Sequence, residues 1–365
     1  MIREHPGISR LEIARESKLS PTAVTMITAR LVQGGLLVEK KLEASSHLGR
    51  RPTALYLQAN SRLAIGVEIT PADAYLVLTD LTGKTVEELE VPHQADANSM
   101  LEQVHLGILK LIGRARSPLL GVGVSLPGIL DPVTGKVIAA TNLRWHDVEA
   151  IAALRRDLIL PFYYENNSNL SALAEWWFGS PNLKNFVFVT FRGGIGAGLI
   201  VGGHLQQGAS FRAGEFGHMS IEAKGRVCLC GNRGCWEEYA SDRAIVRSYA
   251  QGGGAAESAM EIVQRARAGE EMALAVLREA AVYMALGFAN IAVALNPETI
   301  VVDDFVAAGW DILEPLIWER LREQRQPFWL SDLKIVPSEH ALDSSRLGAV
   351  ALVLSKYFHE SGPLA

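Results

Sequence analysis

The chain has 365 residues, of which 48% are hydrophobic, and its three cysteines all lie within one stretch of eight positions. This length and composition predict two or three domains with large buried cores, and the odd, clustered set of cysteines argues against a disulfide scaffold. No apolar run reaches transmembrane length and no signal peptide opens the sequence, so we expect a cytoplasmic protein with no membrane insertion.

The formal net charge of −5 is unevenly distributed along the chain. Residues 1–62 hold ten Lys and Arg against five Glu and no Asp, whereas the remaining residues hold 25 basic and 35 acidic side chains. This contrast indicates that only the front of the chain meets a polyanion, although a stretch of this length can also be basic by chance.

Two short helices are predicted at the basic end. Ser9 and Glu12 have the residue types and spacing of a capping box that begins the first helix, which ends near Ser17. After a tight turn, Ser20 and Pro21 begin a second helix as its N-cap and its first helical residue.

The second helix is expected to be amphipathic. Val24, Ile27 and Leu31 recur at helical spacing and are expected to face a core, and the pair Gly34-Gly35 ends the helix. The β-like runs 36–38 and 54–57 then predict a hairpin wing with a polar loop between its strands.

Helix, turn, helix and wing together predict a winged helix-turn-helix DNA-binding domain over residues 1–60. In this arrangement the second helix enters the major groove, and an arginine pair on the wing enters a minor groove or clamps phosphates. The candidate DNA-binding residues are Ser20, Thr22, Thr25, Met26, Arg30, Arg50 and Arg51. The alternative is that the two helices pack as an ordinary corner of a helical bundle.

A short cysteine run is the most specific feature of the sequence. Cys228, Cys230 and Cys235 follow the pattern Cys-x-Cys-x4-Cys, and His218 precedes the run by ten residues. Three thiolates and an imidazole form a tetrahedral ligand set for zinc, and nearby glycines supply the tight turns of a metal knuckle. The alternative is that the cysteines are buried without a metal.

The remaining residues, 61–365, predict an α/β body. Three consecutive strands are followed by alternating helices and strands, and a similar order then recurs. The predicted strands cover 64–69, 75–80, 85–89, 120–126, 162–165, 186–191, 196–201 and 299–302, and the predicted helices cover 100–115, 170–177 and most of 257–294. This order resembles the two-lobed actin-like ATPase core, with one lobe over 61–164 plus the C-terminal helix and the other over 165–342.

Several ordered motifs in the body carry a closer resemblance. They are Leu126-Pro127-Gly128, Asn142-Leu143-x-Trp145, Glu165-Asn166-Asn167-x-Asn169, Gly194-Ile195-Gly196-Ala197-Gly198, Gly214-Glu215-x-Gly217-His218 and the cysteine run ending in Glu237. With these motifs nearly the whole chain resembles the ROK family of repressors, open reading frames and sugar kinases. A winged helix in front of such a body is similar to the family's repressor branch.

The resemblance implies a zinc site and a sugar site. His218, Cys228, Cys230 and Cys235 match the family's zinc ligands, and we expect this zinc to be structural because four protein ligands leave no open position for water. The positions that match or line the sugar site are Gly128, Asn142, Asn166, Asn167, Glu215, His218 and Glu237. Amide and carboxylate side chains suit a sugar because they pair with its hydroxyl groups.

Four departures from the family's kinases fall in the machinery of phosphoryl transfer. Asn167 stands where the resemblance implies an aspartate, and a neutral amide cannot act as the base. Residues 68–71 lack the glycines of a first phosphate loop, and residues 192–194 lack the threonine of a second. Asp303-Asp304 replaces a glycine pair that binds adenosine, and two carboxylates there are expected to repel a polyphosphate. We therefore expect a protein that is not an enzyme.

The resulting expectation is a sugar-responsive transcriptional regulator. We expect a repressor of carbohydrate uptake or catabolism genes that binds a double-stranded DNA operator as a homodimer or homotetramer, with a sugar or sugar phosphate as effector. One alternative is an ATP-dependent sugar kinase, and another is a regulator controlled by the docking of a sugar-transporter protein.

Overall fold

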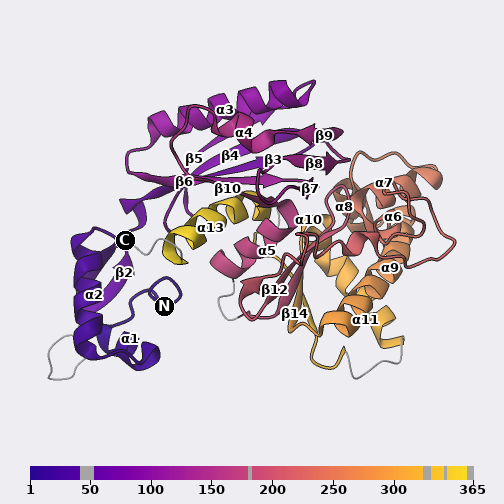
Figure 1. Cartoon of the computed structure of the whole chain (residues 1–365). Coiled ribbons are helices and arrows are strands. Elements are labelled where there is room, and N and C mark those ends of the chain that lie inside the picture. Colours follow the sequence, from indigo (N-terminus) through magenta and orange to yellow (C-terminus); the bar gives the residue numbers. More distant parts are fainter. Residues whose placement is uncertain (42–52, 180–182, 324–329, 341–342, 360–365) are drawn as a thin grey trace. The chain divides into compact units, whose positions relative to one another are not determined.

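The computed structural model describes residues 1–41, 53–179, 183–323, 330–340 and 343–359 (Figure 1). Its internal contacts divide the chain into two compact units. Unit 1 comprises Met1–Val124, Ala150–Tyr164 and Ala349–Ala365, and unit 2 comprises Ser125–Glu149 and Glu165–Gly348. The segment Ser125–Glu149 packs within unit 2, whereas the sequence pattern assigned it to the lobe 61–164.

Two helices and a hairpin form the front of unit 1. They are α1 (Arg10–Ser17), α2 (Pro21–Gln33), β1 (Leu37–Lys41) and β2 (Thr53–Leu57), and the two strands pair antiparallel. The predicted capping box is present: the Ser9 hydroxyl accepts a hydrogen bond from the Glu12 N–H at 3.3 Å, and the Glu12 carboxylate accepts one from the Ser9 N–H at 2.8 Å. The predicted order of two helices and a hairpin is therefore confirmed.

A small apolar core holds these elements together. The buried residues of this core are Ile8, Ile13, Ala14, Val24, Leu37 and Leu55. The prediction for Ile27 is wrong, because its side chain is 44% exposed while the neighbouring Thr28 is 3% exposed. Thr28 can be buried because its hydroxyl donates to the Val24 carbonyl oxygen at 2.8 Å and accepts from Arg10 Nε at 2.7 Å.

A five-stranded sheet with the order β10–β6–β3–β4–β5 forms the centre of unit 1. Its strands are β3 (Leu63–Ile69), β4 (Asp73–Asp80), β5 (Thr85–Pro92), β6 (Leu119–Leu126) and β10 (Phe162–Asn166). Helices α3 (Ala97–Arg114) and α4 (Ala150–Arg155) cover one face, and α13 (Ser344–His359) covers the other (Figure 1). Every residue of β3 is buried, as expected of a central strand that is covered on both faces.

Unit 2 contains a second five-stranded sheet, with the order β13–β12–β11–β14–β15. Its strands are β11 (Phe186–Thr190), β12 (Gly196–Val201), β13 (His204–Leu205), β14 (Thr299–Val302) and β15 (Lys334–Pro337). A separate sheet contains β7 (Ile129–Leu130), β8 (Val137–Ala140) and β9 (Trp145–Val148). The helices described here are α5 (Asn167–Phe178), α6 (Glu237–Ala240), α7 (Asp242–Gln251), α8 (Ala259–Arg267), α9 (Glu271–Leu295), α10 (Asp304–Ala308) and α11 (Trp310–Glu323).

The two faces of this sheet pack against different helices because side chains alternate along each strand. On β11, Phe186 and Phe188 pack with Ala172 of α5. Val187 and Val189 instead join the large core that residues of α7, α8 and α9 form on the opposite face. Successive residues of this fully buried strand therefore belong to two separate hydrophobic clusters, one on each face of the sheet.

Helix α9 is apolar and long enough, by length and composition, to cross a membrane. Half of its most apolar window is buried, and Leu277, Met284 and Phe288 are completely buried in the core of unit 2. A core helix of a globular protein passes the same test, so α9 gives no support to membrane insertion.

Candidate functional site

The cysteine run folds into a small knuckle in unit 2. An isolated antiparallel bridge between Val227 and Arg233 turns the run back on itself. The turn ends at Gly234, whose φ of +73° lies in the left-handed region that favours glycine. A Cβ at this position would lie 1.8 Å from the Glu222 carbonyl oxygen, so the close approach of the two segments also requires glycine.

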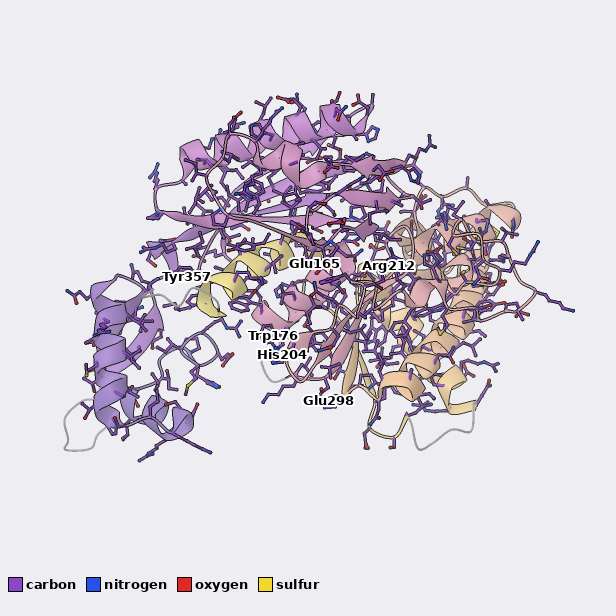
Figure 2. The ribbon with its side chains drawn as sticks, in the orientation of Figure 1. Glu165, Trp176, His204, Arg212, Glu298 and Tyr357 are labelled. Atoms are coloured by element: carbon purple, nitrogen blue, oxygen red, sulfur yellow. The ribbon has the colours of Figure 1, made fainter. Side chains whose placement is uncertain are left out.

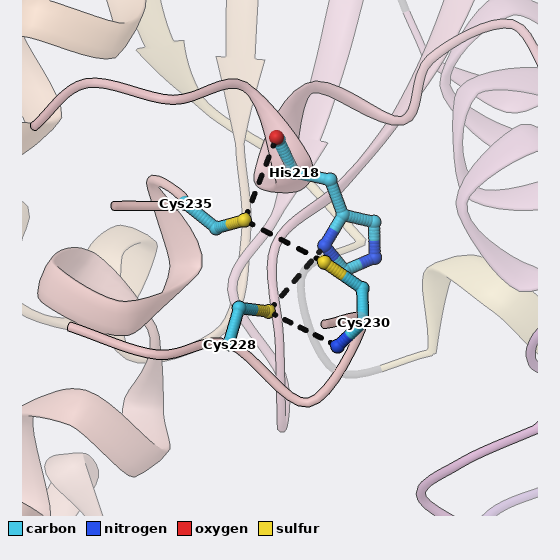
Figure 3. Close-up of side chains that lie close together, drawn as sticks. All are labelled: His218, Cys228, Cys230 and Cys235. Carbon is cyan, nitrogen blue, oxygen red and sulfur yellow. Dashed lines mark hydrogen bonds between the residues drawn. The ribbon is translucent and has the colours of Figure 1, made fainter. Parts of the chain in front are cut away.

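The four predicted ligand atoms meet in this knuckle (Figure 3). The Sγ atoms of Cys228, Cys230 and Cys235 and one ring nitrogen of His218 all lie within 4.8 Å of one another. The Cys230 and Cys235 Sγ atoms are 3.7 Å apart, and Cys228 Sγ is 3.7 Å from His218 Nδ1. A tetrahedral zinc ion with bonds of about 2.3 Å to sulfur and about 2.1 Å to nitrogen requires S–S and S–N separations of about 3.8 and 3.6 Å. The donor set therefore fits a tetrahedral metal ion.

Burial determines the protonation state of the buried thiols in the knuckle. Cys228 and Cys235 are buried, whereas Cys230 is exposed. Desolvation raises the pKa of the Cys228 and Cys235 thiols, so these side chains keep their protons unless a cation replaces them. A bound metal ion would supply that cation and would couple the fold of the knuckle to metal binding.

Glu237 connects the candidate metal ligands to the predicted sugar residues. Its Oε1 accepts a hydrogen bond from Cys228 Sγ at 3.0 Å and lies 3.6 Å from His218 Nδ1. The other ring nitrogen, His218 Nε2, lies 3.9 Å from Glu215 Oε2. The structure thus brings three predicted sugar residues together, with the imidazole between two carboxylates.

Glu215 remains accessible although its carboxyl is partly desolvated. Desolvation raises its pKa; His218 opposes this shift, and the nearby Glu237 adds to it. The Glu215 side chain is still 48% exposed, so a ligand can reach its oxygens. The Glu237 side chain is only 11% exposed, so the more exposed Glu215 offers most of the hydrogen-bond acceptors to the hydroxyl groups of a sugar.

The loop 214–218 lies directly on β12. Gly214 has a φ of +91°, and a Cβ there would lie 1.9 Å from the Ala197 carbonyl oxygen. Gly217 is equally close to the backbone of the segment before β12. The Ala197 N–H also donates a hydrogen bond to the Gly214 carbonyl oxygen at 3.1 Å. The glycines of the Gly-Glu-x-Gly-His motif therefore hold the acidic and imidazole side chains beside the sheet.

Asn166 caps α5 and holds the Gly128 turn. Its Oδ1 accepts a hydrogen bond from the Ser168 N–H at 2.9 Å, and its Nδ2 donates to the Gly128 carbonyl oxygen at 3.0 Å. Asn142 is exposed in the turn between β8 and β9, and Asn167 is the first residue of α5. Within the parts of the chain that the structure describes, these two side chains form no hydrogen bond with the other predicted sugar residues.

Glu165 is a carboxylate that the sequence motif contains but that was not predicted as a site residue. The residue is labelled in Figure 2. Its Oε1 accepts hydrogen bonds from the Asn166 N–H at 2.7 Å and from Asn169 Nδ2 at 3.1 Å, and its Oε2 accepts one from Gln207 Nε2. The Asn169 contact joins residues only four positions apart, from the end of β10 to the first turn of α5. Gln207 lies 42 residues away, and no local pattern links it to Glu165.

Glu238 is a second carboxylate that the sequence analysis did not identify. Its side chain is 4% exposed, and its oxygens accept hydrogen bonds from Arg243 at 2.9 Å and Arg247 at 2.7 Å. The two arginines are four residues apart on α7 and therefore share one face of that helix. This buried group fixes the segment that follows the knuckle.

The residues at the predicted first phosphate loop bond to one another. In the turn between β3 and β4, the Thr70 hydroxyl donates to the Asp73 carbonyl oxygen at 2.9 Å and accepts from the Asp73 N–H at 3.1 Å. The Thr70 N–H donates to the same carbonyl oxygen at 2.9 Å. These bonds close a tight hairpin turn, in which the Thr70 and Asp73 amides already have partners.

Asp303, at the predicted adenosine position, differs from the sequence expectation. It is 1% exposed, and desolvation, with a smaller contribution from Asp304, raises its pKa to about 8. The carboxyl is therefore mostly protonated at neutral pH, and the expected repulsion by two charged carboxylates is correspondingly weaker. Asp303 instead accepts hydrogen bonds from the Phe191 N–H at 3.4 Å and from the Thr190 hydroxyl, which joins β14 to the end of β11.

The predicted DNA-binding residues of the second helix lie on an exposed side of α2. The exposed members are Thr22, Thr25, Met26 and Arg30. Ser20 is the N-cap, and its hydroxyl accepts a hydrogen bond from the Ala23 N–H at 3.2 Å. Arg50 and Arg51, predicted to lie on the wing, are outside the described residues.

Fold and site together define the class of protein. A helix-turn-helix with a hairpin wing precedes an α/β body that contains a candidate metal knuckle beside a group of carboxylates. The chain belongs to the ROK family, whose model matches residues 64–356. A model described as winged helix-turn-helix DNA-binding matches residues 1–38.

Curated relatives match almost the whole chain. The N-acetylglucosamine repressor of Escherichia coli O157:H7 is 30% identical over 368 residues, which cover 97% of this chain and 90% of the relative. The xylose repressor of Bacillus subtilis (strain 168) is 27% identical over 370 residues, which cover 98% of this chain and 93% of the relative.

Solved structures of two kinds resemble the model. The crystal structure of a ROK family transcriptional regulator, a homologue of the E. coli MLC protein, has a TM-score of 0.81 at 26% identity and covers 95% of this chain and 91% of that one. A ROK family glucokinase from Streptomyces griseus, in complex with glucose and AMPPNP, has a TM-score of 0.69 at 25% identity and covers 79% of this chain and 97% of that one. The regulator therefore matches a larger share of this chain than the kinase does.

Proposed function

We propose that this protein is a sugar-responsive, DNA-binding transcriptional repressor of carbohydrate uptake or catabolism genes. The observation that carries the proposal is the presence, in one chain, of a winged helix-turn-helix module and a ROK body with Asn167 in place of the catalytic aspartate. The first part binds a double-stranded DNA operator, and the second binds the effector.

The relatives support both halves of this proposal. Two matched relatives are named as repressors for xylose and for N-acetylglucosamine, and the matches extend across more than nine tenths of this chain. A sugar or a sugar phosphate is therefore the chemical class of effector that we assign. The repressed genes would act on the same carbohydrate.

The effector site is assigned to the group around His218, in which the Glu215 side chain is 48% exposed and the Glu237 side chain is 11% exposed. Glu215 and Glu237 flank the imidazole at 3.9 and 3.6 Å, and their carboxylates offer hydrogen-bond acceptors to sugar hydroxyls. The full set assigned to sugar binding is Gly128, Asn142, Asn166, Asn167, Glu215, His218 and Glu237.

We infer that kinase chemistry has been lost. Asn167 has no group that can accept the proton of a sugar hydroxyl. Phosphoryl transfer also needs backbone N–H groups that cradle phosphates, and the Thr70 and Asp73 amides are already bonded within a closed turn. The similarity to a glucokinase supports a shared fold and sugar site rather than shared chemistry.

The metal assigned to the knuckle is structural zinc, held by His218, Cys228, Cys230 and Cys235. The ligand atoms of two pairs, Cys230 Sγ with Cys235 Sγ and Cys228 Sγ with His218 Nδ1, lie 3.7 Å apart, which matches a tetrahedral set. Four protein ligands leave no position for a reacting water. The ion would order the segment that carries Glu237. In this way zinc would support effector binding without taking part in any reaction.

The DNA contacts are assigned to a domain over residues 1–60. Ser20, Thr22, Thr25, Met26 and Arg30 would face the major groove, and Arg50 and Arg51 would meet phosphates or the minor groove. Residues 61–365 would hold the effector and assemble a homodimer or homotetramer. A dimer would present two helices to two half-sites, and a cytoplasmic location would give it access to DNA.

Effector and operator are coupled only if the sugar favours one of two arrangements of the protein. A sugar that binds the arrangement with unsuitable spacing of the two DNA-binding helices would release the operator. The same linkage requires that operator DNA lower the affinity for that sugar by an equal factor.

Two other functions make different predictions. An ATP-dependent sugar kinase would consume ATP when its sugar is present. A regulator controlled by a sugar-transporter protein would respond to that protein and not to free sugars.

The test of the proposed function is selection of bound fragments from the source organism's genomic DNA with the purified full-length chain at moderate salt. Enrichment of a two-fold symmetric site in front of carbohydrate genes is the expected result. The absence of any enriched site, together with ATP consumption in a panel of sugars, would instead establish the kinase.

A further inference from the structure

The first turns of α2 present an unusually apolar surface. Thr22 lies three and four residues before Thr25 and Met26, and Ala29 lies four and three residues after them, so all four share one face of the helix. All four are exposed, and the Met26 side chain is 57% exposed. This face points away from the small core around Val24, so it contributes nothing to the packing of the module.

Thr25 strengthens the apolar character of this face. Its hydroxyl donates a hydrogen bond to the Pro21 carbonyl oxygen, one turn earlier, at 2.8 Å. Because the hydroxyl proton is committed to the backbone, a methyl group and an acceptor oxygen are what Thr25 offers to a ligand.

The charged and amide side chains that recognise guanine, adenine or cytosine by hydrogen bonds are confined to the end of α2. Residues 21–29 contain no Arg, Lys, Asn, Gln, Asp or Glu, and the helix then continues to Arg30 and Gln33. In a helix-turn-helix, the N-terminal residues of the second helix are the ones that contact base edges. Those first turns therefore hold no side chain for paired hydrogen bonds to a G·C pair, and their threonine hydroxyls offer only single hydrogen bonds to a base edge.

We propose that α2 recognises the C5 methyl groups of thymines in an A·T-rich half-site, through apolar contacts of Met26, Thr25 and Thr22. The inference rests on the proposed DNA-binding function and adds the base that is read. Thymine alone among the four bases presents a methyl group in the major groove, and apolar side chains and threonine methyls are its natural partners.

Charge favours DNA as the occupant of this face. Residues 1–62 carry ten basic and five acidic side chains, and exposed Lys18 and Arg30 lie close in sequence to the two ends of the apolar stretch. Basic groups near an apolar stripe suit a major groove, where phosphates border the thymine methyls. A protein partner would make no use of this positive border unless it were itself acidic.

The experiment uses the duplex that the full-length protein enriches from a random-sequence library. Each thymine of one half-site is replaced in turn by deoxyuridine, which removes the methyl group and keeps the base pair. Affinity is measured by fluorescence anisotropy. At each contacted position we expect affinity to fall about fourfold, which corresponds to about 0.8 kcal/mol for one buried methyl-sized group.

Two variants assign the contact to a side chain. Met26→Ala should weaken binding to the thymine duplex about fourfold or more and should bind thymine and uracil equally at one position. Ile27→Ala is the matched control, because Ile27 is apolar and 44% exposed but lies about 100° around the helix axis from Met26. It should keep the full preference for thymine.

Several results would overturn the inference. An enriched site whose thymine and uracil versions bind equally would exclude methyl recognition while leaving DNA binding intact. A change in oligomeric state of Met26→Ala with unaltered DNA affinity would assign the face to a protein contact. Failure to enrich any sequence would instead remove the proposed DNA-binding function and this inference with it.

Discussion

The indole Nε1 of Trp236 donates a hydrogen bond to the backbone carbonyl oxygen of Tyr283 at 2.8 Å. Trp236 is completely buried and stands in sequence between the candidate ligand Cys235 and the carboxylate Glu237. Because Tyr283 belongs to α9, this bond fixes the end of the knuckle to a helix of the core. The candidate metal site and the candidate effector site therefore share one rigid support.

The substitution Gly287→Ala tests whether α9 supports the knuckle through Trp236. A Cβ at Gly287 would lie 2.1 Å from the Trp236 ring, so Gly287→Ala must displace the indole. We expect a loss of about 1–3 kcal/mol in the free energy of unfolding, measured by chemical denaturation. Gly113→Ala is the control, since a Cβ at Gly113 of α3 meets nothing within 4 Å and should stabilise the helix slightly. Equal effects of the two substitutions would contradict the tight contact at Trp236.

The substitution Cys230→Ala tests whether the knuckle binds zinc. Cys230→Ala removes one of four ligands, so we expect the zinc content to fall from about one ion per chain to near zero and the melting temperature to drop. Zinc is measured by mass spectrometry after purification. Leu229→Ala, at a neighbouring residue that is 66% exposed, should leave both values unchanged. Full zinc content in Cys230→Ala would exclude this thiol as a ligand.

Glu215 tests the effector site. Glu215→Ala should abolish the change in DNA affinity that the effector causes, while affinity without effector stays within about twofold of the wild type, because Glu215 lies outside residues 1–60. The measurement is anisotropy of an operator duplex with and without sugar. Glu149→Ala, which removes another exposed carboxylate of unit 2, serves as the control. A normal sugar response of Glu215→Ala would place the effector elsewhere.

Asp303 predicts a particular dependence of stability on pH. Its pKa is about 8 in the folded protein and near 3.8 when unfolded, so the native state binds the extra proton between these values. The contribution of Asp303 is therefore fully favourable below pH 4 and is lost as the pH rises through 8. Asp303→Asn removes this dependence and keeps a neutral group that can accept the Phe191 hydrogen bond.

The comparison is made by denaturation of both proteins from pH 4 to pH 8. We expect the unfolding free energy of Asp303→Asn relative to the wild type to rise with pH, by at most about 1.4 kcal/mol per pH unit. A constant difference across this range would mean that Asp303 titrates normally.

Asn167 tests the loss of kinase chemistry. Asn167→Asp restores a carboxylate at the base position, but residues 68–71 still lack a glycine phosphate loop. We therefore expect no sugar-dependent ADP formation above the background of the wild type. Turnover in the variant would mean that the base alone had been lost and that the nucleotide site is intact.

Local features of the fold were predictable from the sequence. Ser9 and Glu12 interact over three residues, and the cysteine ligands lie within eight positions, so their geometry follows largely from short-range chain conformation. The strand predicted over 186–191 is likewise present, as Phe186–Thr190, in a continuous apolar run.

Features that depend on distant partners were not predictable. Helical spacing assigned Ile27 to the core, but Thr28 took that place because Arg10, eighteen residues away, bonds its hydroxyl. The burial that raises the pKa of Asp303 arises from segments that meet only in the folded unit. The contact between Glu165 and Gln207 has the same origin.

The central claim is that a sugar controls DNA binding without being phosphorylated. The most direct measurement titrates the enriched operator duplex and full-length protein, in the presence of ATP, with a panel of sugars and sugar phosphates. Anisotropy and ADP formation are followed together. We expect one compound to change operator affinity at least fivefold while no ADP forms. Sugar-dependent ADP formation with unchanged operator affinity would contradict it.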